Sequence, residues 1–394
     1  MQSSSQELPA ELVSRMLPWH AKIVTKSRSF SRLALRVYRK GGSPTTAGNY
    51  AKDLLIFCKW VTGKEDPDPD LLIAENRDWP KVVNEYLDFY VSKEGNARTS
   101  ARTKVAAIKK WLEVNEVLSS RDMAWQAVDM PKYIRGETDQ IPTKRELRTA
   151  LSGGNVRDRA LVLVAVSSGL RRGSLLALKF KDIDLEQEVP AIKPRPETTK
   201  GKVRFFTFIT PEAKQAILLY RKEREMRGET LTPESYVFTV DRPRGQPYTS
   251  GIQASARWIE LLRRSGLAEK GRKIYKMHFH TLRVFFRYWC SLSGVNRDVI
   301  EFMMGHRRTL EQVYFVRDVE NVPKEIVKRL EAEYLKAVPA LTVMSDEDKL
   351  REQESRITEQ ATNLRAKEVL IDQLRERLDA IEALVRAKKA PSHT

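Results

Sequence analysis

The chain has few cysteines and no long apolar run, which argues against a disulfide-rich secreted protein and against a membrane protein. Cys58 and Cys290 are its only cysteines among 394 residues, and their separation fits neither a disulfide framework nor a metal-ligand spacing. The longest apolar run, residues 160–166, is far short of the roughly 20 residues that a membrane span needs. The first residues, MQSSSQELPAEL, lack the pattern of a signal peptide. We therefore expect a cytoplasmic protein with reduced thiols and no membrane partner.

The sequence also lacks two common marks of cofactor chemistry. It has no acidic cluster with metal-ligand spacing and no glycine-rich loop of the kind that cradles phosphates. We therefore expect a reaction that uses side chains alone, with no metal and no other cofactor.

What the chain has in excess is positive charge. It carries 70 Lys and Arg against 52 Asp and Glu, which gives a net charge of +18. The stretch from Ser345 onward holds 10 basic and 11 acidic residues, so the excess lies in the first 344 residues. A body this basic attracts polyanions, of which nucleic acid is the usual one. Net charge alone does not identify the partner, because ribosomal and membrane-surface proteins are also basic.

The first third of the chain predicts helices. Residues 1–40 form a helical extension with several basic residues, Lys22, Lys26, Arg28, Arg32 and Arg36. Residues 41–132 predict a compact helical domain, and its first helix begins at a cap on Thr45 or Thr46. Polar residues 133–142 predict a linker to the next domain.

Residues 143–340 predict a second domain with both helices and strands. Thr143 and Glu146 have the spacing of a capping box, and a buried helix follows over 157–168. Residues 177–210 are rich in short β-prone runs, which indicates a small antiparallel sheet. Helices return from Pro211. The predicted fold class is therefore mainly α with a small antiparallel β-sheet.

The tail over 345–390 repeats apolar residues every seven positions, at Leu350, Ile357, Leu364, Ile371, Leu378 and Val385. A strict period of seven favours a coiled coil, which predicts self-association or a partner helix. A single amphipathic helix that folds back on the body would fit the same repeat.

The residues that carry chemistry stand in a fixed order. Arg171 follows Gly-Leu in SSGLRRGS, and the run HTLR places His280 and Arg283 three apart, on one helical face. His306 follows a glycine 23 residues after Arg283, and Tyr314 comes eight residues later.

This order resembles the tyrosine recombinase (phage integrase) family over about residues 45–330, and the resemblance implies that the helical domain over 41–132 is its DNA-binding (core-binding) domain. The family pattern is an Arg in a GLR box, a Lys in a β-hairpin, HxxR, GH and a Tyr. The resemblance implies that Arg171 and Arg283 grip the scissile phosphate, for which the bidentate guanidinium is suited. It implies that His280 and His306 add hydrogen bonds or move protons, and that Tyr314 attacks phosphorus to leave a 3′-phosphotyrosine.

Three positions are ambiguous or depart from the family pattern. The resemblance implies a lysine that protonates the leaving 5′-oxygen; Lys200 in PETTKGKVRFF fits best, and Lys202 is the alternative. Arg172 is the alternative to Arg171. Ser174 stands where the family usually has an acidic residue that orients the arginine, so the support of Arg171 must be built differently.

The resemblance implies a site-specific recombinase, the integrase of a virus, plasmid or other mobile element. Such enzymes act on double-stranded DNA at attachment sites as homo-tetramers and pass through a Holliday junction, without metal or ATP. Two different functions would also fit the pattern: strand nicking and closing like that of a type IB topoisomerase, and a non-catalytic DNA-binding scaffold with the same fold.

Overall fold

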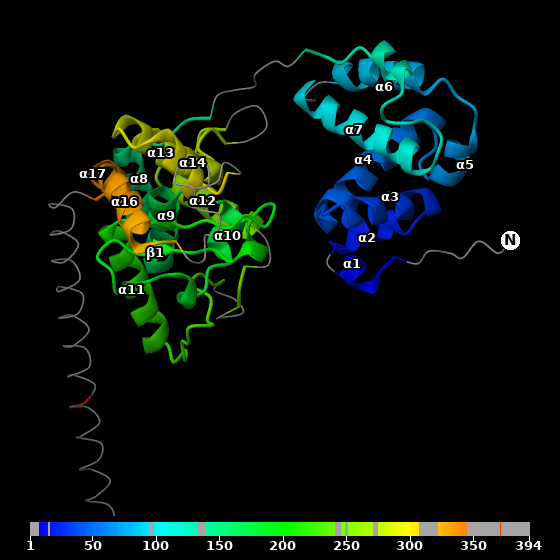
Figure 1. Ribbon diagram of the computed structural model, residues 1–394. Coiled ribbons are helices and arrows are strands. Elements are labelled where there is room, and N and C mark those ends of the chain that lie inside the picture. The colour runs from blue at the N-terminus through cyan, green and yellow to red at the C-terminus, as the bar shows by residue number, and fades with distance from the viewer. Residues whose placement is uncertain are drawn as a thin grey trace, which may run out of the picture. The chain divides into compact units, whose positions relative to one another are not determined.

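The protein is mainly helical and forms two compact units, which divide between residues 138 and 139 (Figure 1). The computed structural model describes residues 8–14, 16–93, 98–132, 139–240, 246–248, 251–270, 275–306, 322–344 and 371. Within these residues, the one sheet has two antiparallel strands, which confirms the predicted mainly α fold with a small antiparallel sheet. The predicted coiled coil lies outside the described residues except for Ile371. None of the helices described is long and apolar enough to span a bilayer.

The first unit is built of helices around an aromatic core. Its elements are α1 (Ala10–Ser14), α2 (Pro18–Val24), α3 (Arg28–Arg39), α4 (Pro44–Thr62), α5 (Pro69–Ala74), α6 (Trp79–Ser92), α7 (Arg98–Val114) and the 3-10 helix η1 (Met123–Ala127). Phe30 of α3 is fully buried with Phe57 of α4 and Trp111 of α7 in one apolar cluster. The sequence predicts residues 1–40 as an extension, but their helices share this core and belong to the same unit.

The turn into α4 shows why the predicted helix start is wrong. Ser43, not Thr45 or Thr46, is the N-cap: its hydroxyl accepts the backbone N–H of Thr46 at 3.1 Å. Pro44 therefore occupies the first helical position, where its missing N–H costs nothing. Gly63 ends the helix with φ 68°, a left-handed conformation that favours glycine.

The second unit wraps helices around one central helix. Its elements are α8 (Lys144–Ser152), α9 (Val156–Ser168), α10 (Arg172–Leu176), η2 (Phe180–Asp182), β1 (Ala191–Ile192), η3 (Pro196–Thr198), β2 (Thr207–Phe208), α11 (Pro211–Met226), α12 (Gly251–Arg264), α13 (Phe279–Leu292), α14 (Arg297–Met303), α16 (Lys324–Leu335) and α17 (Val338–Leu341). Almost every residue of α9 is buried, and α11, α13, α17 and β2 pack against it. The capping box of Thr143 and Glu146 is present.

The small sheet is shorter than the β-rich sequence indicates. Ala191 pairs with Phe208 and Ile192 with Thr207, and an isolated bridge joins Ile183 to Ile192. The rest of residues 177–210 forms 3-10 turns and extended loop. The connection from β1 to β2 carries both candidate lysines, Lys200 and Lys202, on a turn beyond the strands.

Candidate active site

The GLR box is a helix end followed directly by a helix start. Gly169 terminates α9 with φ 62°, and the ring of Phe286 lies 2.3 Å from where its Cβ would stand. A side chain at this position would be strained and would also collide with the ring, so glycine is required. Two residues later, Arg171 is the N-cap of α10.

The GH box is the C-terminal cap of α14. The N–H of His306 bonds the carbonyl of Glu301 at 3.0 Å, and the N–H of Gly305 bonds the carbonyl of Phe302 at 2.8 Å. This is the bond pair of a Schellman motif, whose left-handed residue is Gly305 at φ 64°. The motif places His306 immediately after α14. It also exposes the carbonyls of Met304 and Gly305, which lie at the negative end of the helix.

Both arginines reach those carbonyls. Arg171 Nη1 donates to Gly305 O at 2.9 Å, and at 3.4 Å to Met304 O. Arg283 Nη2 donates to Met304 O at 2.8 Å, and its Nη1 donates to Gly169 O. Among the described residues, neither guanidinium forms an ion pair with a carboxylate. The arginines are thus oriented by backbone dipoles rather than by direct carboxylate partners among the described residues.

The pKa of Arg283 reflects a buried charge without a direct carboxylate partner among the described residues. Burial, together with the charge of Arg171, lowers the pKa of Arg283 to about 9 from 12.5, and Glu301 opposes the shift. A guanidinium keeps its proton in proteins, so the shift measures how unfavourable the buried charge is. At 1.36 kcal/mol per pKa unit, the cost is about 5 kcal/mol in order of magnitude. Burial also lowers the pKa of Arg171. An anion bound between the two cations would relieve this cost.

His306 joins Arg283 to a carboxylate that the sequence alone does not reveal. Its Nε2 lies 2.9 Å from Arg283 Nη2, and its Nδ1 lies within hydrogen-bond distance of Glu301 Oε2. The other Glu301 oxygen pairs with Arg287 at 2.8 Å. Burial alone would raise the pKa of Glu301, but the hydrogen bond from His306 and nearby positive charge lower it. The only sign of Glu301 in the sequence is that an acidic residue stands five positions before His306.

His280 stands beside the arginines on the exposed side of α13. Its pKa is lowered from 6.5 by partial burial, then by the charges of Arg283, His278 and Arg171, against an opposing effect of Asp139. A neutral imidazole is thus the favoured form near pH 7. Arg171, Arg283 and His306 are thus joined by hydrogen bonds at the end of α14, and the charges of both arginines act on His280, one helical turn before Arg283.

Ser174 ties the helix of Arg171 to the lysine turn. Its buried hydroxyl donates to Thr198 O at 3.0 Å, from α10 to the loop between β1 and β2. Lys200 is exposed on this turn, and Lys202 is exposed with φ 54°. A serine hydroxyl thus supports the loop at the position where relatives of this type have an acid.

Two side chains that could compete for a role in the site are held elsewhere by their contacts. Arg172 points to α12, where it hydrogen-bonds Ser255 and fills the space that a Cβ on Gly251 would need. Tyr334 is fully buried, its hydroxyl donates to Ser167 O at 2.9 Å, and burial raises its pKa. Both side chains are therefore occupied structurally. Tyr314 lies outside the described residues.

Comparisons with known proteins agree on one family. Residues 143–318 match the model of the phage integrase family. The chain is 25% identical to prophage integrase IntR of Escherichia coli (strain K12) over 194 residues, 44% of this chain and 45% of that protein. It is 24% identical to tyrosine recombinase XerC of Xanthomonas axonopodis pv. citri (strain 306), over 72% of this chain and 89% of that protein.

Solved structures show the same fold at low identity. The XerH site-specific recombinase, bound to a palindromic difH substrate in a post-cleavage complex, superimposes with a TM-score of 0.51 at 17% identity, covering 83% of this chain and 91% of that one. A lambda integrase tetramer bound to a Holliday junction gives a TM-score of 0.50 at 18% identity, covering 71% and 76%.

Proposed function

Because this chain belongs to the phage integrase family of tyrosine recombinases, we propose that it cuts and rejoins DNA through a 3′-phosphotyrosine formed by Tyr314. The observation that carries the proposal is the cluster of Arg171, Arg283 and His306 around the end of α14. Two fixed cations that form no ion pair with any carboxylate of the described residues suit a phosphate whose negative charge grows in the transition state.

The chemistry follows from the groups available. Arg171 and Arg283 bind the two non-bridging oxygens, and His280 and His306 add hydrogen bonds or relay protons. The Tyr314 oxygen forms a bond to phosphorus while the bond to the 5′-oxygen breaks. Lys200 protonates that oxygen, which leaves as a hydroxyl. The phosphotyrosine ester keeps the bond energy, so the 5′-hydroxyl of a second strand can attack it without ATP.

We extend the proposal to partners and assembly. The substrate is double-stranded DNA at specific attachment sites, and lambda integrase, which shares the fold, has been seen as a tetramer on a Holliday junction. We infer a homo-tetramer on DNA, an origin in a virus, plasmid or other mobile element, and a cytoplasmic location. The heptad repeat over residues 345–390 predicts a coiled coil, and we propose that it supports self-association or recruits a partner.

Denaturing electrophoresis after incubation with the attachment-site DNA tests the chemistry directly. Wild-type protein is expected to give a covalent DNA–protein band, and Tyr314→Phe is expected to bind the DNA and give none. A band from Tyr314→Phe would show that another residue is the nucleophile. Tight binding by the wild type without any band would favour the scaffold, and relaxation of supercoiled plasmid regardless of sequence would favour a topoisomerase.

A further inference from the structure

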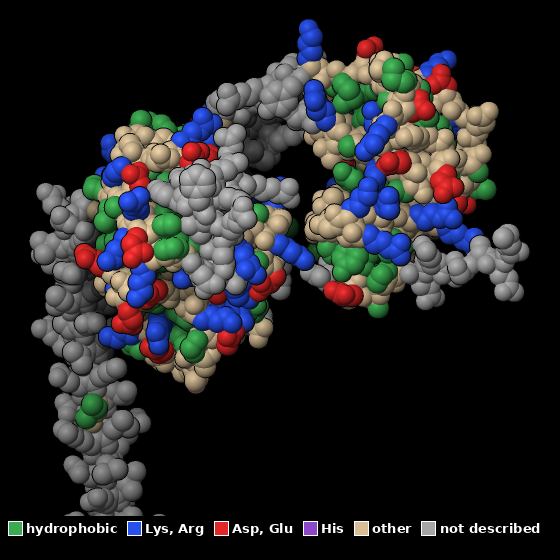
Figure 2. Space-filling model, in the orientation of Figure 1, with side chains coloured by type: hydrophobic (Ala, Val, Ile, Leu, Met, Phe, Trp, Pro, Cys, Tyr) green, Lys and Arg blue, Asp and Glu red, His purple; other side chains and the backbone are tan. Residues whose placement is uncertain are grey.

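Helix α3 presents a row of arginines to solvent. Arg28, Arg32 and Arg36 recur every four residues, so they lie on one face about 6 Å apart along the axis, and all three are exposed. The opposite face is fixed in the core by Phe30 and Leu33, both fully buried. Figure 2 shows Lys and Arg side chains gathered on the face of the first unit around α3.

This arrangement works against the stability of the helix itself. Like charges four residues apart destabilise a helix by about 0.2–0.5 kcal/mol per pair, and the row contains two such pairs. Arg28 is also the first residue of α3, where the helix dipole disfavours a cation. The helix contains no Asp or Glu that would offset these charges. Of the three, only Arg36, in the last turn, is favoured by the helix dipole. Helix stability therefore gives no reason for Arg28 and Arg32.

The arginines are also uncommitted, unlike other basic residues of the unit. In the described part of the chain, no ion pair involves Arg28, Arg32 or Arg36. By contrast, Lys104 pairs with Asp53 at 2.7 Å and Lys59 with Glu65 at 2.8 Å. Since acids are available on this unit and the three arginines avoid them, their charge is free for an external anion.

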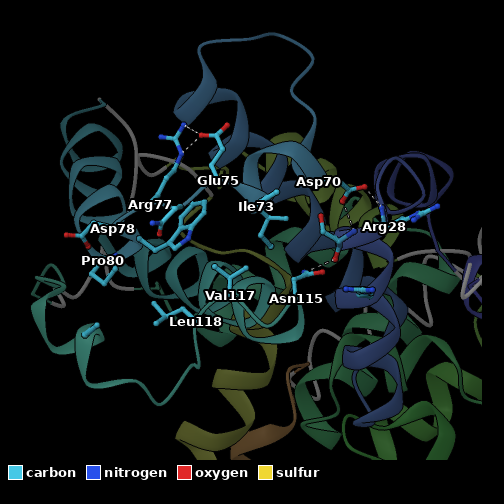
Figure 3. Close-up of a pocket in the computed structure, with 16 residues that line it drawn as sticks. Arg28, Asp70, Ile73, Glu75, Arg77, Asp78, Pro80, Asn115, Val117 and Leu118 are labelled. Carbon is cyan, nitrogen blue, oxygen red and sulfur yellow. Dashed lines mark hydrogen bonds and ion pairs between the residues drawn. The ribbon is translucent and has the colours of Figure 1, made fainter. Parts of the chain in front are cut away.

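A cavity of about 780 Å³ lies beside the row, and both Arg28 and Arg32 line it (Figure 3). The carboxylates in its wall are engaged. Asp70 accepts the backbone N–H groups of Arg28 and Ser29 at 2.8 Å, Glu75 pairs with Arg77, and Asp78 caps α6. The indole N–H of Trp79, also in the wall, is buried without a partner. The cavity wall thus combines two exposed arginines with carboxylates that already accept hydrogen bonds or form an ion pair.

We propose that the exposed face of α3 binds the DNA backbone, as a contact additional to the DNA-binding domain predicted over 41–132; this inference rests on the proposed action on DNA. A row of equivalent cations matches a polymer of equivalent phosphates. A protein partner fits less well, because protein interfaces have apolar and aromatic cores and α3 exposes no large hydrophobic side chain. Contacts of this kind supply affinity and register rather than sequence reading.

The salt dependence of binding measures such contacts. Each neutralised phosphate contributes about 0.9 to the slope of log K against log salt concentration. The double variant Arg32→Gln/Arg36→Gln is therefore expected to lower the slope by about 1.8 on a duplex of random sequence, followed by fluorescence anisotropy. Between about 50 and 200 mM salt, it should lose about tenfold less affinity than the wild type. Its melting temperature should not fall, because a repulsive pair is removed.

Two controls separate a specific surface from general charge. Lys81→Gln/Arg121→Gln removes two exposed charges from the same unit and should leave the slope nearly unchanged. Arg32→Lys/Arg36→Lys keeps the charges and should keep the slope.

Three results would overturn the inference: no change in the α3 double variant, equal changes in both glutamine pairs, or loss of polyglutamate binding with the DNA slope intact, which would indicate an acidic protein partner. None of these measurements requires strand cleavage, so they do not depend on the chemistry of Tyr314.

Discussion

Arg171 and Arg172 provide the sharpest test of the site, because they are neighbours of the same type with different contacts. Arg171→Ala should slow formation of the covalent complex by at least about 10³-fold, the effect expected for an arginine that stabilises transferring phosphate. Arg172 contacts Ser255 on α12 instead. Arg172→Ala should therefore stay within about tenfold of the wild-type rate.

Arg171→Ala should change the free energy of unfolding little, because it removes a repulsion as well as hydrogen bonds. Arg171 Nη1 and Arg283 Nη2 bond the same oxygen of Met304 at 3.4 and 2.8 Å, so these nitrogens lie no more than about 6 Å apart. Two charges at that distance repel by about 3 kcal/mol at an effective dielectric constant of 20. The one short charged hydrogen bond that Arg171→Ala removes, to Gly305 O at 2.9 Å, is worth about 1.5–3 kcal/mol, and the shared contact of the same nitrogen at 3.4 Å adds little. The two effects nearly cancel.

Urea unfolding and single-turnover cleavage of Arg171→Ala together test whether Arg171 serves catalysis or stability. We expect a change in the free energy of unfolding below about 1.5 kcal/mol and a large loss of rate. A loss of stability above about 3 kcal/mol would mean that Arg171 is structural and that repulsion from Arg283 is weaker than the distance implies. A rate loss in Arg172→Ala with Arg171→Ala active would move the catalytic role to Arg172.

Three further predictions concern the surrounding groups. Lys200→Ala should slow cleavage about 10²–10⁴-fold. A substrate with sulfur in place of the bridging 5′-oxygen should restore the rate of this variant, since a thiolate leaves without a proton. If Lys202→Ala shows this pattern instead, Lys202 is the general acid. Glu301→Gln keeps a hydrogen-bond acceptor for His306 but removes the charge. It should slow cleavage about 10–100-fold, as for other carboxylates that orient histidines, and Glu301→Ala should be slower still. Unchanged cleavage rates would refute an orienting role for Glu301. The His280 ring should titrate below pH 6.5 by NMR and move upward in Arg283→Met, because burial and Arg283 lower its pKa. The unfolded chain then binds more protons, so His280 makes stability fall as the pH drops from 6.5 through the lower folded pKa. Titration at or above 6.5 would contradict this.

Local patterns in the sequence predict the parts of the site that depend on helical spacing. His280 and Arg283 share a face of α13 because residues three apart do so in any helix. The capping box of Thr143 forms for the same local reason. In both cases the determining residues lie within one turn of each other, so no knowledge of the tertiary fold is needed.

Tertiary packing decides the rest. Nothing in the order GLR and GH says that Arg171 and Arg283 meet at the carbonyls of α14, since those contacts join residues more than 100 and 20 positions apart respectively. The sequence shows Glu301 only as an acid five residues before His306, and does not show its role, because that role exists only once the cap at Gly305 turns His306 back toward it. The sequence predicts an extension over residues 1–40 because helical periodicity does not reveal which core a helix joins.

The choice of partners at the site follows a single electrostatic logic. A carboxylate beside Arg171 would orient it but would also cancel charge that a phosphate needs. Here Ser174 holds the lysine loop instead, and carbonyls, which carry only partial charge, hold the arginines. The nearest carboxylate, that of Glu301, is directed to His306 and Arg287. Orientation is thus obtained from groups that do not neutralise the guanidiniums, and an incoming phosphate would relieve the unfavourable buried charge that lowers the pKa of Arg283.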